Sequence, residues 1–349
     1  MTHSISQAAQ DYLAGKRVLV TGACGTIGKK LIEIMSTQVD LAELTALDHN
    51  ETELVFLEER FARKDRIKFR LGDIRDSDCI MRELRKIDLI FHTAAYKHVY
   101  MCERSPMEAV ATNIVGCQNI ISAAMENGVE RLVFTSSDKA VNPTNVMGTS
   151  KLMGERLVTA AALDAHIGHS ILLSTRFGNV LGSRGSVVPI FQEQIRQGGP
   201  VTLTDPEMTR FIMSLDQAAL LVIESAVIGK PGEVLITKMP AINIADLAQV
   251  MIADLAPRYG HNVADIAMKV IGAKPGEKLY EELMNVEEVR RTFEIDRYFV
   301  IRPALHANET PMANTKRVTE PYNSSNAALL SRAEIREFLR QNNILPSID

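Results

Sequence analysis

The sequence predicts an α/β fold built on a doubly wound parallel sheet, with a smaller, discontinuous lobe added from the C-terminal part of the chain. Over the first two-thirds of the 349 residues, short β-branched runs alternate with longer amphipathic segments, the pattern of a parallel sheet flanked by helices. Several of these runs are almost entirely apolar, as expected of strands that helices cover on both faces. After Phe177 the chain becomes rich in glycine, proline and polar residues, which indicates a lobe of loops and short helices.

The expected elements follow from this pattern in chain order. The strands are Arg17–Gly22, Glu43–Asp48, Ile67–Gly72, Asp88–Thr93, Arg131–Ser136, Ser170–Phe177 and Glu233–Thr237. Apolar residues at helical spacing predict helices at Ile27–Met35, Met107–Asn127, Val146–Ala162 and Leu215–Val227. We expect residues 1–177, with 213–240 returning to them, to form the sheet domain, and residues 178–212 and 241–349 to form the substrate lobe.

The composition argues against several classes of protein. Hydrophobic residues make up 46% and charged residues 23%, with a formal net charge of −4, which suits a globular enzyme and not a nucleic-acid-binding protein. The four cysteines show no C-x-x-C spacing, so we expect reduced thiols, no disulfide and no metal site. The N-terminus lacks the features of a secretion signal, and no run of about 18 apolar residues occurs. We therefore expect a soluble cytoplasmic protein that does not contact a membrane.

A glycine-rich turn near the N-terminus predicts a dinucleotide site. In VLVTGACGTIGKKL, Gly22, Gly25 and Gly28 follow an apolar strand, and a helix begins around Thr26 and Ile27. Glycines are required where the backbone turns sharply and lies close to a pyrophosphate, which binds at the N-terminus of the helix. The strand before this motif and the helix after it make the predicted sheet a Rossmann-type fold.

The acidic residue that ends the second strand predicts which dinucleotide binds. Asp48 lies about 20 residues beyond Gly28, where a carboxylate accepts hydrogen bonds from the adenosine ribose and repels a 2′-phosphate. No arginine follows it in the segment DHNETE, so NAD is expected and not NADP. Asp73 and Ile74 close the third strand and are expected at the adenine edge, although Asp73 could instead cap the next helix.

Longer segments resemble one subgroup of the extended short-chain dehydrogenase/reductases. They are HTAAYKHVYMCERSPMEAVATNIVGCQNI, FTSSDKAVNPTNVMGTSKLMGERL, RFGNVLGSRGSVVPIF and KPGEKLYEEL, and the resemblance runs from about Lys16 to about Tyr298. The subgroup contains the UDP-N-acetylglucosamine 4,6-dehydratases of polysaccharide biosynthesis and flagellin glycosylation. The resemblance implies NAD as cofactor, a UDP-sugar as substrate and a homo-oligomer.

The resemblance also implies a role for each matching residue. It implies that Ser137, Asp138 and Lys139 form the catalytic group beside the nicotinamide, with Lys151 holding the nicotinamide ribose. The residues implied for the cofactor and active-site wall are Ala94, Ala95, Lys97 and Asn113. The residues implied for the nucleotide-sugar are Lys97, Asn179, Ser186, Val187, Val188, Arg210, Lys274 and Glu277.

The chain departs from the pattern of these relatives at four positions. Cys24 stands where glycine is common, and Ser137 stands where threonine is usual. Lys274 replaces an arginine. A guanidinium group that can form two parallel hydrogen bonds is thereby replaced by a single ammonium charge. Met147 occupies the place, four residues before Lys151, where the wider family has a tyrosine base, and a thioether cannot accept that proton. Some members of the subgroup also carry methionine here.

The implied reaction needs a base and an acid acting on one sugar. Hydride leaves C4 for NAD, water is lost across C5 and C6, and the hydride returns to C6. We expect Lys139 to remove the C5 proton and Asp138 to protonate the departing 6-hydroxyl, each with a pKa moved toward neutrality by burial or by the other's charge. The proton of the 4-hydroxyl leaves either through Ser137 to Asp138 or through a water held by Lys151.

Two other functions are compatible with the same fold. A UDP-sugar 4- or 5-epimerase forms the same transient ketone, but simple C4 epimerisation does not need the Asp138–Lys139 pair. The function of a non-catalytic NAD-binding sensor would explain the missing tyrosine. A sensor, however, does not need the motifs that bind a substrate. The dehydratase is therefore the preferred interpretation, with the epimerase second and the sensor third.

Overall fold

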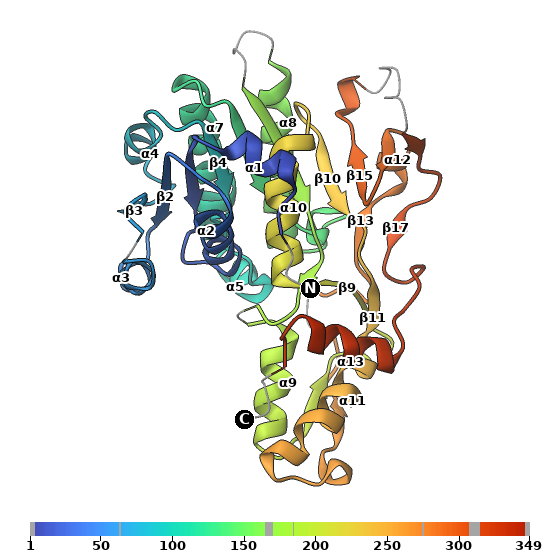
Figure 1. Cartoon of the computed structure of the whole chain (residues 1–349). Helices are drawn as coiled ribbons and strands as arrows, with labels where there is room; N and C mark the ends of the chain where they lie inside the picture. The colour runs from blue at the N-terminus through green and yellow to red at the C-terminus, as the bar shows by residue number, and fades with distance from the viewer. Residues whose placement is uncertain are drawn as a thin grey trace.

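The computed structural model describes residues 4–62, 64–164, 170–183, 185–273, 276–306 and 315–345. Its centre is a ten-stranded sheet with the strand order β16-β14-β15-β10-β6-β5-β4-β1-β2-β3 (Figure 1). Helices cover both faces of this sheet, and a smaller lobe extends from the carboxyl ends of its parallel strands. The predicted fold class is confirmed.

Seven strands of the sheet are parallel, and each overlaps a predicted strand. They are β1 (Arg17–Thr21), β2 (Glu43–Asp48), β3 (Ile67–Leu71), β4 (Leu89–His92), β5 (Arg131–Thr135), β6 (Ile171–Arg176) and β10 (Val234–Thr237). Their order reverses direction at β1, with β2 on one side and β4 on the other. In an open α/β sheet the crevice at such a reversal is where ligands bind.

Three antiparallel strands extend the sheet beyond β10, and the sequence analysis did not expect them there. They are β14 (Thr292–Ile295), β15 (Tyr298–Ile301) and β16 (Lys316–Arg317). They belong to the part of the chain that was assigned to the substrate lobe. Without these strands, β10 would be the edge of the sheet. Its pairing with β15 satisfies the backbone hydrogen-bonding groups that such an edge leaves open.

Two layers of helices bury the faces of the sheet. One layer contains α1 (Gln7–Leu13), α2 (Thr26–Gln38), α3 (Glu51–Arg60) and α10 (Leu215–Ile228), whose apolar residues share one core. The other contains α4 (Ser77–Glu83), α7 (Cys117–Glu126) and α8 (Val146–Leu163). No helix in the described part of the chain is long and apolar enough to cross a membrane.

The helix predicted at Met107–Asn127 is interrupted. After α5 (Val99–Arg104), the segment consists of α6 (Pro106–Ala109), a π-helical stretch (Val110–Gly116) and α7. A π-helical stretch inside a helix inserts a residue and is frequent at functional sites. Asn113 lies in this stretch, and its side chain donates hydrogen bonds to the carbonyl oxygen of Tyr96 and to Ser150.

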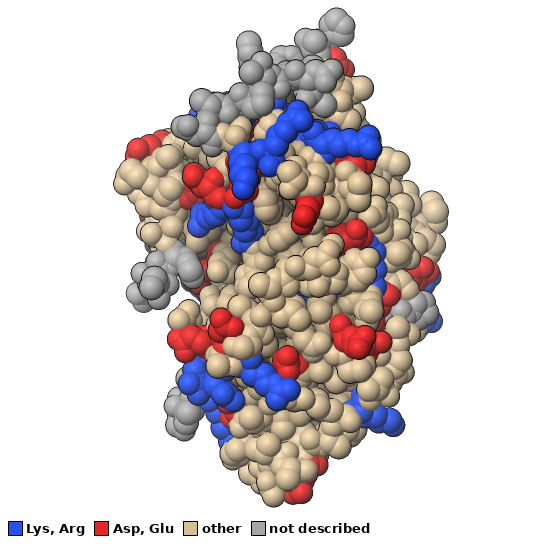
Figure 2. All heavy atoms as spheres, turned by 90° about the vertical axis from the view of Figure 1, so that its right-hand side faces the viewer, with Lys and Arg blue, Asp and Glu red and all other residues tan. Residues whose placement is uncertain are grey.

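The lobe has its own core, at the bottom of Figure 1. It contains the apolar faces of α9 (Val187–Arg196), α11 (Ile244–Leu255) and α13 (Arg332–Gln341). The remaining short elements are β7 (Asn179–Val180), β8 (Val201–Leu203), β9 (Thr209–Met213), β11 (Ala241–Asn243), β12 (Met268–Val270), β13 (Glu282–Met284), α12 (Val286–Val289), β17 (Tyr322–Asn323) and the 3₁₀ turns at 138–140, 257–259, 263–265 and 304–306. Figure 2 shows the face on the right-hand side of Figure 1, where basic and acidic side chains lie close to one another in clusters and a broad area between them carries few charges.

Candidate active site

The glycine-rich turn between β1 and α2 has the close contacts that the sequence predicts. Gly22 has a φ of +68°, and a Cβ atom there would lie 2.7 Å from the Cα atom of Ala94. A Cβ atom on Gly28 would lie 2.2 Å from the carbonyl oxygen of Gly22. A larger residue at either position would push the turn out of place. The N-terminus of α2, which begins at Thr26, is therefore free to receive a phosphate group.

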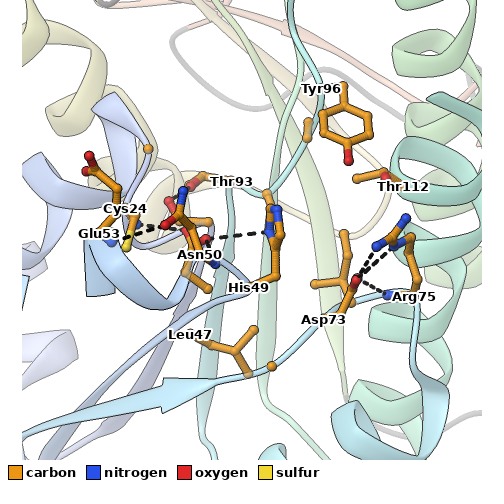
Figure 3. A pocket seen from close by; sticks show the side chains of 17 residues that line it. Cys24, Leu47, His49, Asn50, Glu53, Asp73, Arg75, Thr93, Tyr96 and Thr112 are labelled. Atoms are coloured by element: carbon orange, nitrogen blue, oxygen red, sulfur yellow. Dashed lines mark hydrogen bonds and ion pairs between the residues drawn. The ribbon is translucent and has the colours of Figure 1, made fainter. Parts of the chain in front are cut away.

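A cavity of about 220 Å³ lies beside this turn and contains Asp48. The carboxylate of Asp48 is 7% exposed and accepts hydrogen bonds from the backbone N–H groups of Cys24 (2.9 Å) and Asn50 (3.0 Å). It therefore connects the end of β2 to the glycine-rich turn. Figure 3 shows Asn50 and Glu53 on one side of this cavity, with Asp73 on the other.

The alternative that Asp73 caps a helix is not what the structure shows. The residue that caps α4 is Asp76, whose side chain accepts a hydrogen bond from the N–H group of Cys79 at 3.0 Å. Asp73 and Ile74 both line the cavity. Hydrogen bonds from Arg75 hold the pKa of Asp73 below its ordinary value. They also hold the Asp73 carboxylate in place on this side of the cavity.

A second cavity, of about 530 Å³, adjoins the first and contains most of the predicted site residues. Gly25 and Ala95 line both cavities, so the two form one elongated cleft across the carboxyl edge of the sheet. The predicted residues that line the second cavity are Gly25, Thr26, Ile27, Ala95, Lys97, Ser137, Asp138, Lys139, Lys151, Asn179, Ser186 and Val187. They come from six separate segments of the chain.

Lys151 occupies the floor of the second cavity. Its ammonium group donates a hydrogen bond to the carbonyl oxygen of Thr135 at 2.9 Å, and burial lowers its pKa to about 8. Met147, one helical turn earlier on α8, is 3% exposed and lines the same cavity. The structure thus puts a thioether where a tyrosine base would stand, and Lys151 is the adjacent titratable group.

Asn113 supports this cavity from behind. Its side-chain amide donates to the carbonyl oxygen of Tyr96 (3.0 Å) and to Oγ of Ser150 (2.8 Å), and its Oδ1 accepts the N–H group of Tyr96 (2.8 Å). It is not among the residues that line the cavities described here. Asn113 therefore fixes the segment after β4 against α8.

Three consecutive residues in the turn after β5 form a hydrogen-bonded group that lines this cavity. Ser137 Oγ donates to Asp138 Oδ1 at 2.6 Å, and Lys139 Nζ donates to the same oxygen at 3.1 Å. A third partner was not predicted from sequence. Glu281 Oε1 lies 3.3 Å from Lys139 Nζ, on the other side of the ammonium group. The adjacent sequence signal, KPGEKLYEEL, pointed to Glu277 and gave no reason to choose Glu281.

The pKa of Lys139 differs from the expectation. Burial lowers it, but the two carboxylates, Asp138 and then Glu281, outweigh burial and raise the pKa above its ordinary value. This direction is opposite to the expected shift toward neutrality, because a neighbouring carboxylate stabilises the ammonium form, and Asp138 contributes more than Glu281. In the resting site Lys139 is an ammonium ion.

A third cavity, of about 400 Å³, opens on the lobe side and shares Lys97, Lys139, Asn179 and Val187 with the second. Arg210 and Glu277 line it, as predicted for a nucleotide pocket. Arg210 also donates hydrogen bonds to the carbonyl oxygens of Thr209, Lys278 and Leu279. It therefore ties the segment before β13 to β9.

The remaining predicted residues lie at or near the start of α9. Ser186 Oγ is buried and has no hydrogen-bond partner among the described residues, and it faces the second cavity. Val188 is 2% exposed and packs in the core of the lobe, away from the cavities. Lys274 lies outside the described residues.

A family model and several known proteins match most of this chain. Residues 18–303 match the family model described as polysaccharide biosynthesis protein. The chain is 44% identical over 336 residues to an uncharacterized membrane protein of Methanocaldococcus jannaschii, covering 96% of this chain and 98% of the relative. It is 35% identical to a UDP-N-acetylglucosamine 4,6-dehydratase (inverting) of Campylobacter jejuni, over 83% of this chain and 84% of that protein. It is also 35% identical to a UDP-glucose 4-epimerase of Rickettsia canadensis, over 93% and 95%.

A solved structure shows the same similarity in three dimensions. Pen from Bacillus thuringiensis has a TM-score of 0.89 and 40% sequence identity, and the match covers 96% of this chain and 100% of that chain.

Proposed function

The chain belongs to the family of polysaccharide biosynthesis proteins, within the extended short-chain dehydrogenase/reductases, and we propose that it is an NAD-dependent UDP-N-acetylglucosamine 4,6-dehydratase. It is an enzyme of the nucleotide-sugar dehydratase and epimerase class. The single observation that carries the finer proposal is the Ser137–Asp138–Lys139 group, with its acid and its amine 3.1 Å apart beside the cleft. Elimination of water needs both.

The first two cavities fit NAD. The glycine-rich turn leaves room for a pyrophosphate at the start of α2, and Asp48 and Asp73 line the cavity beside it. A carboxylate at Asp48 favours a ribose with free hydroxyls over a 2′-phosphate. When bound, NAD accepts a hydride from C4 of the sugar and returns it to C6.

Replacing Asp48 with alanine should weaken NAD binding and reduce discrimination against NADP. The ribose loses an acceptor and a 2′-phosphate loses the charge that repels it. Titration of both cofactors by protein fluorescence or calorimetry measures the effect, which we expect to be about tenfold in the ratio of dissociation constants. Equal binding of NAD and NADP by the unmodified protein would contradict this assignment.

Proton transfer through Ser137 and Asp138 balances the loss of water. The 4-hydroxyl proton passes through Ser137 Oγ to Asp138, along the 2.6 Å hydrogen bond. Asp138 then gives this proton to the departing 6-hydroxyl, which leaves as water. Lys139, as a neutral amine, removes the C5 proton, and the resulting ammonium group, whose protons exchange with solvent, returns a proton to C5. Each atom lost from the sugar is thereby accounted for.

The third cavity suits the nucleotide part of the substrate. Arg210 and Glu277 line it, and the N-terminus of α9 lies where it meets the second cavity, since Val187 lines both and the unpartnered Ser186 Oγ belongs to a residue that lines the second. Backbone N–H groups at a helix N-terminus bind a diphosphate well. We place UDP here.

Replacing Arg210 with alanine should then raise KM by about tenfold or more, with a smaller change in kcat, because the contact is shared by ground and transition states. Initial-rate kinetics over a range of substrate concentrations measure both constants. A large fall in kcat with unchanged KM would move Arg210 into the catalytic group.

Incubation with UDP-N-acetylglucosamine tests the proposed function. The expected product is lighter by one water, seen by mass spectrometry. The similarity to the UDP-glucose 4-epimerase favours an epimerase as the second candidate. A product of unchanged mass with altered NMR couplings would establish that function instead.

A further inference from the structure

Glu281 completes a line of alternating charges through the mouth of the cleft. Lys139 Nζ lies 3.1 Å from Asp138 Oδ1 and 3.3 Å from Glu281 Oε1, and Glu281 Oε1 lies 3.7 Å from Nε of Arg210. Glu281 is 3% exposed. Lys139 is therefore held between two buried carboxylates, one from the sheet domain and one from the segment that leads into β13.

Each of these carboxylates has one oxygen without a partner. Asp138 Oδ2 and Glu281 Oε2 are buried, and neither has a hydrogen-bond partner among the described residues. A buried, unpartnered carboxylate oxygen is costly, and protonation of the carboxyl group lowers that cost. Burial raises the pKa of Glu281, and the negative charge of Asp138 raises it further, against the opposing effects of Lys139 and Arg210.

Lys139 must lose a proton before it can act as a base. Two carboxylates keep Lys139 charged in the resting site, and during the reaction only one of them keeps its negative charge. When the 4-hydroxyl proton reaches Asp138, that carboxylate becomes neutral. Glu281 is then the one negative partner left among the groups within 4 Å of Lys139 Nζ that the structure describes. A proton that leaves Lys139 at this point has Glu281 as its nearest anionic acceptor.

We propose that Glu281 is the positioning residue that receives the proton of the Lys139 ammonium group and so generates the neutral amine inside the site. This inference rests on the proposed function. One N–H bond of Lys139 breaks and one O–H bond forms on Glu281, and the amine then removes the C5 proton. After the proton is returned to C5, Glu281 gives its proton back to Lys139. The cycle leaves the charge of the site unchanged.

The other charged groups around the pair provide a matched control. Asp138 reaches Lys139 from the turn after β5, Arg210 reaches Glu281 from β9, and Lys97 and His98 line the same two cavities. Glu282 is the next residue in the chain but pairs with Lys278 (3.3 Å) and accepts hydrogen bonds from Asn142. Glu282→Gln therefore removes a carboxylate from the same segment without touching Lys139.

The first test compares single-turnover dehydration in Glu281→Gln, Glu281→Asp and Glu282→Gln. Glu281→Gln keeps the size of the side chain but cannot accept the proton. Its dehydration rate should fall by about 10²-fold near pH 7, with KM unchanged and with C4 oxidation, seen as NADH absorbance, retained. The rate should then rise about tenfold per pH unit, since only enzyme whose Lys139 is already neutral can react.

The controls should keep a different pH profile. The unmodified enzyme, Glu281→Asp and Glu282→Gln should show nearly constant dehydration rates between about pH 6 and pH 8, because an internal acceptor makes the step independent of solvent protons. Glu281→Asp should lose part of its rate because the shorter side chain reaches less far. A Glu281→Gln variant with a flat profile and a rate within about threefold of the unmodified enzyme would overturn the proposal.

The second test does not depend on any substrate. The side chain of Lys139 is 24% exposed, so an amine-selective acylating reagent can label it, and mass spectrometry of its peptide gives the pH midpoint of labelling. In Glu281→Gln this midpoint should fall by about 1 pH unit or more, and in Glu282→Gln it should not move. An unchanged midpoint in Glu281→Gln would overturn the proposal. If UDP-N-acetylglucosamine loses no water with the unmodified enzyme, the proposed function fails, and the labelling result still decides whether Glu281 controls Lys139.

Discussion

Lys139→Ala should stop dehydration while leaving the oxidation of C4 in place. The variant, mixed with UDP-N-acetylglucosamine, should accumulate enzyme-bound NADH, because hydride transfer uses the Ser137–Asp138 route for the 4-hydroxyl proton. The dehydrated product should fall by about 10²–10⁴-fold, the usual contribution of a general base. Absorbance of the reduced nicotinamide and mass spectrometry of the sugar measure the two steps separately.

Three further results would decide how Lys139 acts. The unmodified enzyme in D₂O should place deuterium at C5, and the hydride returned to C6 should remain protium. A variant that accumulates no NADH would assign Lys139 to the oxidation step, where the tyrosine is missing. A loss of less than about tenfold would mean that Lys139 is not the base. Lys238→Ala is the matched control, since Lys238 is also held by a carboxylate, that of Glu294, but lies outside the cleft.

Arg176→Leu should destabilise the protein by about 3–5 kcal/mol, the usual cost of removing one partner of a buried ion network. Arg176 is 1% exposed and forms ion pairs with Glu155 (2.6 Å) and Glu288 (2.7 Å). Burial opposes its charge, but the two carboxylates outweigh burial and raise its pKa above the ordinary value. The substitution leaves both carboxylates buried without their cation. The midpoint of urea unfolding, followed by circular dichroism, measures the change in the free energy of unfolding.

The same arginine also holds the site together. Arg176 ends β6, Glu155 lies on α8 one turn after Lys151, and Glu288 lies on α12. Its Nη1 group donates to the carbonyl oxygen of Leu283, two residues after Glu281, at 3.1 Å. Arg332→Ala is the control, because the Arg332–Asp246 pair is on the surface and should contribute less than about 1 kcal/mol. A cost for Arg176→Leu as small as that of the control would contradict the structural role.

Much of the site could be predicted because local chain geometry produces it. The Gly22–Gly28 turn, Asp48 at the end of β2 and the Ser137–Asp138–Lys139 group after β5 each depend on one strand and its next turn. Parallel strands bring their carboxyl ends to one edge of a sheet, so these segments had to meet. Short runs of β-branched and apolar residues likewise predicted all seven parallel strands.

Other features depend on contacts between segments far apart in the chain. The β14–β15 hairpin adds to β10 in the opposite direction, and its short strands carry no signal of which edge they join. The π-helical stretch at Val110–Gly116 lies inside the predicted helix, and it differs from an α-helix in its backbone hydrogen bonds, which the spacing of residue types does not reveal. Arg210 was predicted to hold the nucleotide, and the structure adds that it binds the segment before β13.

The sequence by itself determined the Rossmann-type sheet, the dinucleotide cleft and the residues at the ends of the strands, because each follows from local spacing and from the direction of the chain. Only the tertiary structure showed that a second carboxylate, that of Glu281, lies beside the Lys139 ammonium group. Glu281 is more than a hundred residues away in the chain, and it reaches Lys139 because Arg176 and Arg210 hold its segment against the sheet. Electrostatic interactions depend on distance in space and on burial, and neither quantity can be read from the order of residues.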